Sequence, residues 1–303
     1  MAHADNPRIA ITVLLLSVTA MAFADALIKW ISADFSVWHV FLVRSLFGLP
    51  CLLLVTRALG APLRGNTAWV WIRSVLLVLC WLAFYAALPT LDLSVAAVVV
   101  YTNPIITTLL AATILREPIT RHHIAAVALG FLGVLVIIRP GTDAVSGAVL
   151  LPLAAAVFYS AAMILTRTRC RSENPFTLGI ALHTTFIAVG ALGLITLSGV
   201  ALPTELNAST QFLLTGWSPM TVFQWGVMAL LGVLSAGYFA GVAYAYQRAK
   251  PHTLATFDYG YLPSAALWGL VLFGEQPDAL TVVGMVLITL AGVLVTRAPD
   301  PSA

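Results

Sequence analysis

Charged residues are scarce in this chain. Of its 303 residues, 9% are charged and 60% are hydrophobic, whereas an ordinary soluble domain carries roughly a quarter charged residues. A soluble fold is excluded on that ground. The net charge of +3 comes from short groups of basic residues, without a broad patch or tail to follow a nucleic-acid backbone. We therefore expect no nucleic-acid partner.

Cysteine is also scarce, with three residues in the chain. Cys51 and Cys80 lie in apolar runs and Cys170 lies in a basic stretch. Three thiols so scattered are too few for a disulfide framework or a metal cage. We expect neither a metal site nor a cofactor.

Catalytic motifs are missing as well. Ser235 lacks a Gly-x-Ser-x-Gly elbow, and His122-His123 lacks the His-Glu-x-x-His spacing of a zinc site. Asp25 and Asp258 fall in apolar segments, but at opposite depths and outside the motifs of an intramembrane aspartyl protease. We predict that the chain is not an enzyme and has no catalytic residue.

Long apolar runs dominate what is present. A bilayer-crossing helix needs about 17 to 25 apolar residues, and ten stretches approach or reach this length. They lie near Ile9–Trp30, Val37–Thr56, Ala68–Leu88, Leu93–Leu115, His123–Ile138, Ala148–Thr166, Phe176–Ser198, Val222–Tyr246, Thr253–Phe273 and Ala279–Thr296.

The second half of the chain repeats the first. A shift of about 159 residues aligns Tyr85 with Tyr244, Pro104 with Pro263, Pro118 with Pro277, and Gly133–Val136 with Gly292–Val295. An odd number of spans in each half makes the two copies enter the membrane in opposite directions. We predict an all-α integral membrane protein of ten transmembrane helices, built as two inverted five-helix repeats, residues 1–141 and 142–303.

Charge predicts the orientation, because cytoplasmic loops retain Lys and Arg. With the N-terminus inside, most basic residues, Arg73 among them, fall in inner loops, and the outer loops receive only Lys29 and Arg139. Both termini are predicted to be cytoplasmic, in the cell (inner) membrane. Ala22-Phe23-Ala24 imitates a signal-peptide cleavage site, but cleavage there would break the repeat and the charge pattern.

Several motifs resemble those of a known family. They are Phe23–Lys29, Phe41–Arg44, Leu115–Pro118, Gly130–Val134 and Phe273–Asp278. In this order, within a ten-span duplication, they look like the EamA-type family of the drug/metabolite transporter superfamily. The resemblance implies a bundle in which the first four helices of each half surround a central cavity and the fifth and tenth pack outside it.

The resemblance also implies an activity. Members of the family move amino acids, S-adenosylmethionine, riboflavin, drugs and other small metabolites. Asn103 precedes Pro104 here, where aromatic amino-acid exporters of the superfamily commonly carry tryptophan. That departure weighs against an aromatic amino-acid cargo.

We therefore expect a secondary-active transporter of a small organic metabolite, such as an amino acid, a nucleoside-like or flavin-like solute, or a drug. Its partners are the solute, the lipid bilayer and, as a candidate coupling ion, the proton. An uncoupled facilitator or channel and a non-transporting scaffold are the alternatives. Neither the direction of transport nor the oligomeric state follows from the sequence.

Ionisable residues inside spans cost roughly 2.5 to 3.5 kcal/mol each on insertion scales, so they need a partner, a wet cavity or a function. Asp25 and Arg44 are predicted to meet near the outer boundary. With Lys29, four residues after Asp25, they form either a structural cluster or an outer gate. Arg44 is also a candidate contact for a substrate carboxylate.

Two further ionisable residues lie toward the inner side. His183 and Asp258 fall at similar predicted depths in the second half. A buried carboxyl and an imidazole are both suited to carrying a proton. The alternative to proton transfer, for each residue, is a static hydrogen bond that only stabilises the fold.

Aromatic and polar residues gather near the midplane, beside two prolines at matching places. Interrupted helices at corresponding positions point to a transporter's binding site. The predicted substrate-binding residues, besides Arg44, are Trp81, Tyr85, Tyr101, Asn103, Tyr159 and Tyr261, and the predicted helix breaks are Pro104 and Pro263. As a set they favour a flat or aromatic-tolerant ligand, although any single tyrosine could simply pack against a neighbour.

Overall fold

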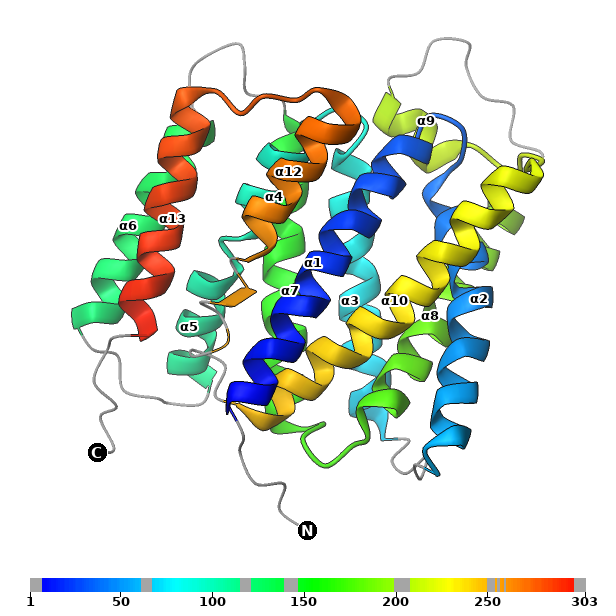
Figure 1. Cartoon of the computed structure of the whole chain (residues 1–303), viewed down its shortest axis with the longest axis horizontal. Helices are drawn as coiled ribbons and strands as arrows, with labels where there is room; N and C mark the ends of the chain where they lie inside the picture. The colour runs from blue at the N-terminus through cyan, green and yellow to red at the C-terminus, as the bar shows by residue number, and fades with distance from the viewer. Residues whose placement is uncertain are drawn as a thin grey trace.

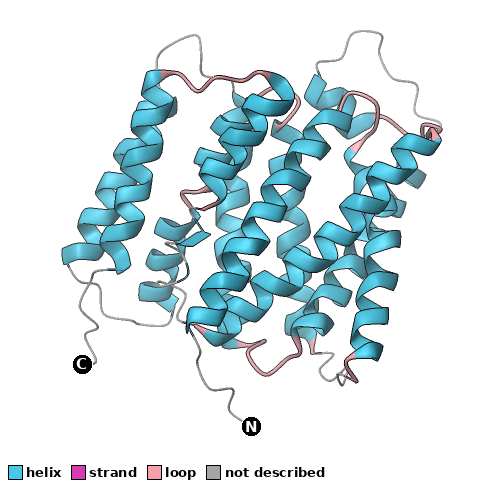
Figure 2. Ribbon diagram, viewed as in Figure 1, coloured by secondary structure: helices cyan, strands magenta, loops and turns pink. Residues whose placement is uncertain are grey.

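The computed structural model describes residues 7–60, 67–114, 121–138, 147–198, 208–249, 254, 257–258 and 260–296. Within these residues every regular element is helical (Figure 2). The elements are α1 (Pro7–Ile31), α2 (Val37–Ala58), α3 (Ala68–Ala87), α4 (Leu93–Val100), α5 (Asn103–Ile114), α6 (Arg121–Ile138), the 3-10 turn η1 (Gly147–Val149), α7 (Leu150–Thr168), α8 (Pro175–Leu197), α9 (Ala208–Leu214), α10 (Val222–Arg248), α12 (Tyr261–Phe273) and α13 (Ala279–Thr296).

Seven helices of the described part are long and apolar enough to cross a bilayer, with α4 and α5 counted as one. They match the first four predicted spans and the sixth, seventh and eighth. The other three predicted spans correspond to α6, α12 and α13, and α12 has only 13 residues, fewer than the roughly 20 that cross hydrocarbon. The chain is a multi-pass membrane protein, and the count of ten spans stays a prediction. The short helix α9 was not predicted.

Local sequence explains where several helices begin and end. The Asn174 side chain accepts a hydrogen bond from the Phe176 N–H, at 2.9 Å, at the start of α8. At the start of α10, Thr221 and Gln224 satisfy each other's backbone N–H groups. α12 ends at Gly274, whose φ of 67° is a left-handed conformation that favours glycine.

The helices pack in pairs. α6 packs chiefly against α13 at one edge of the bundle (Figure 1), which is the place implied for the fifth and tenth predicted spans. In the rest of the bundle the main partners are α2 with α8, α1 with α10, and α3 with α7. α12 packs against α1 and α4. Helices from the two predicted halves therefore interleave throughout the bundle.

Two glycines allow helices to cross closely, as small residues commonly do in membrane proteins. A Cβ atom at Gly190 of α8 would lie 2.7 Å from the Leu42 nitrogen and 2.8 Å from the Trp38 oxygen of α2. A Cβ atom at Gly232 of α10 would lie 2.6 Å from the Arg44 oxygen of α2. α2 is thus held by backbone contact on two sides, and the Arg44 side chain is fixed in the interior of the bundle.

The α2–α8 crossing predicts that Gly190→Ala destabilises the protein, because the new methyl group meets backbone atoms that cannot rotate away. Such overpacking costs about 1–3 kcal/mol. Gly226→Ala on α10 is the matched control, since a Cβ atom there meets nothing within 4 Å and alanine favours a helix. Thermal unfolding of the purified variants measures the difference. Equal midpoints for the two variants would contradict the close crossing.

Candidate functional site

A helix break opens the centre of the bundle. α4 ends at Val100 and α5 begins at Asn103, so the chain leaves the helix at Tyr101 and Thr102. Pro104 is the second residue of α5, and proline lacks an N–H donor and clashes with the turn before it. The interruption of the helix therefore falls beside Pro104, the predicted helix break.

The second half has a comparable feature. Pro263 is the third residue of α12, which begins at Tyr261 after a turn at Gly260. Each of the two aligned prolines thus stands within the first three residues of a helix. The Ser160 hydroxyl of α7 donates a hydrogen bond of 3.0 Å to the Asn103 carbonyl, which links the second half to the break in the first.

A small cavity of about 20 Å³ lies between these segments. This is room for about one water molecule, so the cavity is too small for an organic solute in this structure. Its lining includes five of the predicted substrate-binding residues, and the full set is Met21, Asp25, Cys80, Trp81, Phe84, Val100, Tyr101, Asn103, Tyr159 and Tyr261. The predicted residues Tyr85 and Arg44 lie behind this lining.

Asp25 is the charged residue of the cavity wall, and its side chain is fully buried. The Tyr261 hydroxyl donates to its Oδ2 at 2.8 Å, and the Tyr85 hydroxyl donates to its Oδ1 at 3.2 Å. The Tyr101 and Tyr261 rings stack with centroids 4.9 Å apart and planes inclined by 19°. Aromatic residues of both predicted halves thus converge on one carboxyl group.

Arg44 reaches Asp25 only through Tyr85. Its Nη1 donates to the Tyr85 hydroxyl at 2.9 Å, whereas its Nε and Nη2 make no hydrogen bond within the described residues. The guanidinium instead lies among aromatic rings, 4.7 Å from the centroid of Phe186 and 5.9 Å from that of Phe239. Asp25 and Arg44, which the sequence predicts to interact, do so electrostatically, with the Tyr85 hydroxyl hydrogen-bonded to both.

The alternative in which Lys29 pairs with Asp25 is not what the structure shows. The Lys29 ammonium forms an ion pair of 2.5 Å with Glu275 and donates to the Leu91 carbonyl at 2.7 Å. Glu275 also accepts a hydrogen bond from the Leu93 N–H at 3.0 Å. Lys29 thus joins the ends of α1, α4 and α12, while Asp25, one turn away on α1, turns inward to the tyrosines.

His183 lies beside Arg44 and makes no contact with Asp258. Its ring faces Phe239 and Phe186, with centroids 5.9 and 6.4 Å away, and these are two of the rings that surround Arg44. Neither ring nitrogen has a hydrogen-bond partner in the described part of the chain. His183 therefore belongs to the aromatic cluster around Arg44, and Asp258 lies in a separate site.

Asp258 forms a second buried carboxyl site, with 1% of its surface exposed. The Tyr246 hydroxyl donates to its Oδ2, while its Oδ1 has no partner among the described residues. Tyr159, which lines the cavity, interacts electrostatically with Asp258. The carboxyl thus lies near the cavity but outside its lining.

Sequence reasoning missed Arg73 and Tyr246. Arg73 was counted as a loop cation, but it lies inside α3, is 2% exposed and donates from Nε to the Thr166 hydroxyl at 2.6 Å. Its position within the third apolar run was the available signal. Tyr246 stood at the end of a predicted span, and only the fold brings it to Asp258.

No group of three or more His, Cys, Asp or Glu side chains in the described ranges is arranged to hold a metal ion. What the site does contain is a closed polar and aromatic cavity between membrane-crossing helices. Such a cavity is the class of site expected in a solute carrier.

Comparison with known proteins supports the family resemblance. Residues 8–139 match the model of the EamA-like transporter family, which is the resemblance that the sequence motifs indicated. The matched segment covers most of the first predicted half.

Two relatives cover nearly all of the chain. The pseudopaline exporter CntI of Pseudomonas aeruginosa is 27% identical over 94% of this chain and 95% of its own. The riboflavin transporter of Rhizobium johnstonii is 28% identical over 94% of this chain and 89% of its own. Both are named as transporters, which agrees with the expectation of a non-enzyme.

A solved crystal structure matches with a TM-score of 0.65, covering 95% of each chain at 15% identity. At that identity the likeness concerns the fold alone.

The Asp25–Tyr85–Arg44 chain predicts an energetic coupling that depends on one hydroxyl group. Asp25→Asn and Arg44→Gln should be non-additive, because either change alone leaves a buried charged partner unsatisfied. Tyr85→Phe should lower stability by about 1.5–3 kcal/mol and weaken that coupling. Unfolding of the purified single and double variants measures both effects.

Tyr244→Phe is the control, since Tyr244 is the residue that the repeat aligns with Tyr85. The coupling should persist in that background. If it is unchanged in Tyr85→Phe as well, the hydroxyl does not connect the two charges.

Proposed function

We propose that this protein carries a small organic solute across the membrane by alternating access at the cavity around Asp25. The observation that supports this most directly is the pair of hydrogen bonds to Asp25, from Tyr85 in the first predicted half and Tyr261 in the second. A site shared by two halves is exposed to opposite sides when the halves rock against each other. The cavity holds about 20 Å³, so we assign the structure to an occluded state.

We propose that residues 1–141 and 142–303 are inverted five-helix repeats. The order of the spans in the two halves pairs α1 with α7 and α2 with α8, and the 159-residue alignment pairs α3 with α10 and α6 with α13. Exchanging each helix for its counterpart converts the α1–α10 contact into the α7–α3 contact, and leaves the α2–α8 and α6–α13 contacts unchanged. All four contacts are present, as expected from a pseudo-two-fold axis, and their presence supports the duplication.

We further propose that both termini face the cytoplasm, in the cell membrane. The connection between α7 and α8 supports this, since Arg169 and Arg171 lie there and Arg167 lies in the last turn of α7. Burial of Arg73 removes one cation from the predicted inner loops, and the excess of basic residues in those loops remains.

The solute that this site fits best is flat and bears a carboxylate. Stacked Tyr101 and Tyr261 offer aromatic faces to a planar group. The Nε and Nη2 of Arg44, unpartnered within the described residues, form the edge of a guanidinium that binds a carboxylate with two parallel hydrogen bonds. The names of the relatives, a riboflavin transporter and a pseudopaline exporter, support an organic metabolite.

A ligand screen with paired cysteines tests the shared site. Thermal unfolding in the presence of riboflavin and a panel of amino acids and nucleosides should reveal a stabilising solute, since a ligand at 100 times its Kd adds about 2.7 kcal/mol. Cysteines replacing Tyr101 and Tyr261 should cross-link, and that solute should slow the reaction. Cross-linking that no stabilising solute affects would argue against a shared binding cavity.

Asp258 is our candidate for the coupling proton. Its Oδ1 has no partner within the described residues, so a proton placed there disturbs none of the hydrogen bonds observed. Asp258→Asn imitates the protonated carboxyl permanently. In proteoliposomes we expect exchange of the solute to continue and uphill uptake driven by a pH gradient to disappear.

Asp25→Asn is the comparison, because Asp25 lines the cavity and its change should impair solute binding and therefore both modes of transport. Full pH-driven uptake by Asp258→Asn would show that the proton binds elsewhere. Loss of exchange and of solute binding in Asp258→Asn would make Asp258 a solute contact.

A further inference from the structure

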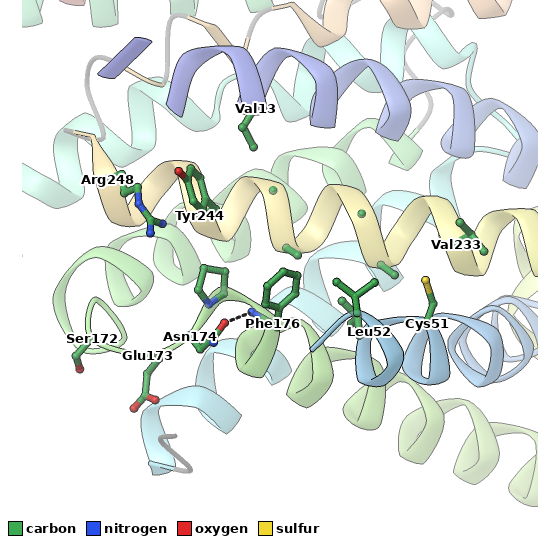
Figure 3. Close-up of a pocket in the computed structure, with 16 residues that line it drawn as sticks. Val13, Cys51, Leu52, Ser172, Glu173, Asn174, Phe176, Val233, Tyr244 and Arg248 are labelled. Atoms are coloured by element: carbon green, nitrogen blue, oxygen red, sulfur yellow. Dashed lines mark hydrogen bonds between the residues drawn. The ribbon is translucent and has the colours of Figure 1, made fainter. Parts of the chain in front are cut away.

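A second and much larger cavity lies on the side of the bundle (Figure 3). It has a volume of about 810 Å³ and runs along α10 from Val233 to Arg248. α2 forms the facing wall with Cys51, Leu52 and Val55, and residues 172–176 close one end. This groove is separate from the cavity around Asp25, with which it shares no lining residue.

Most of the groove is apolar. Leu52 and Phe176 project into it opposite α10 (Figure 3). On α10 its floor consists of the small residues Ala236, Gly237, Ala240 and Gly241. A Cβ atom at Gly237 would meet nothing within 4 Å, so the groove has open space at this position. The floor is therefore shaped to admit an elongated apolar group.

The end of the groove that residues 172–176 close is polar. The Arg248 guanidinium lies 3.7 Å from the centroid of the Tyr244 ring, and its Nη1 is buried without a hydrogen-bond partner in the described part of the chain. Figure 3 shows the side chain directed from α10 toward the segment that carries Ser172 and Asn174. Glu173 lines the same end. A buried donor without an acceptor is unfavourable, and an anion or another strong hydrogen-bond acceptor in the groove would satisfy it.

The length and position of the groove match one leaflet of a bilayer. Arg248 is the last residue of α10, and Val233 lies about 22 Å away along the helix at 1.5 Å per residue. Half of the hydrocarbon core, about 15 Å, plus the adjoining head-group layer spans a similar distance. The polar end thus lies at the membrane surface and the apolar end near the membrane centre.

We propose that this groove is a binding site for one phospholipid of the surrounding bilayer. The lipid phosphate binds the Arg248 guanidinium, which matches phosphate oxygens in geometry and charge. One acyl chain lies along α10 past Gly237 toward Val233. Glu173 at the same end accommodates the ammonium of an ethanolamine head group, so phosphatidylethanolamine satisfies both charges. The site is independent of the proposed transport cycle.

The first test varies the phosphate of the lipid and the Arg248 cation of the protein. Native mass spectrometry of the purified full-length protein should detect a single bound dioleoyl-phosphatidylethanolamine that persists at low lipid concentration. Arg248→Gln should weaken this binding about tenfold or more, because a charge-assisted hydrogen bond is lost. The affinity for dioleoylglycerol, which has the same chains and no phosphate, should not change. Arg57→Gln, an exposed cation in the last turn of α2 outside the groove lining, is the matched control.

The second test fills the groove. Gly237→Phe places a large side chain in the open space and should abolish the lipid adduct. Gly226→Phe, at an equally open and exposed glycine of α10 outside the groove lining, should leave the adduct intact. Equal lipid binding by these two variants, or by Arg248→Gln and Arg57→Gln, would overturn the proposal.

A third measurement needs no substitution. Cys51 lines the groove and is half-buried, whereas Cys80 and Cys170 are buried, and burial also raises the pKa of the Cys170 thiol. Maleimide should therefore react first with Cys51 in detergent, and phosphatidylethanolamine should slow that reaction. An unchanged rate at saturating lipid would count against occupancy of the groove.

Discussion

The Asp25 carboxyl group is fully buried in the interior of the bundle. A buried carboxyl needs donors from the protein itself, and Asp25 receives two, from Tyr85 on α3 and Tyr261 on α12. Because Tyr85 also accepts from Arg44 on α2, one polar chain fixes the positions of four helices. Opening the cavity to a solute requires at least one of these hydrogen bonds to be exchanged for water or for a group of the solute.

Burial of Arg44 is made tolerable by aromatic rings and by a close helix crossing. Its guanidinium lies within 6 Å of the ring centroids of Phe41, Tyr85, Phe186 and Phe239, and a desolvated cation–π contact contributes about 2 kcal/mol. The absence of a side chain at Gly232 lets α10 approach the α2 backbone at this level. A cation held chiefly by rings keeps donor atoms uncommitted, which suits a group that has to bind and release a solute.

The sequence predicted the membrane class, the family and most of the cavity lining, because apolar length, paired prolines and aromatic clusters are local signals. The hydrogen-bond and ion-pair partners of the buried polar side chains were harder to predict. The rule for residues four apart favoured pairing Lys29 with Asp25, but the rotation of α1 directs Lys29 to Glu275, which is distant in sequence and close only in the fold. Arg73 was misplaced for a related reason, since periodicity locates a span without fixing how deep each residue lies. The inward position of Tyr246 likewise depends on packing that no local pattern encodes.

The two buried carboxyl groups differ in a way that separates their roles. Both oxygens of Asp25 accept hydrogen bonds, and two hydroxyl donors favour the ionised carboxylate over its protonated form. Asp258 has one oxygen bonded by Tyr246 and one without a partner in the described residues, so a proton occupies a position that is otherwise unused. Asp25 lies in the cavity wall, where we propose that the solute binds, whereas Asp258 interacts with that wall through Tyr159. We infer that the solute acts on Asp25 and the ion on Asp258, with Tyr159 transmitting the state of one to the other.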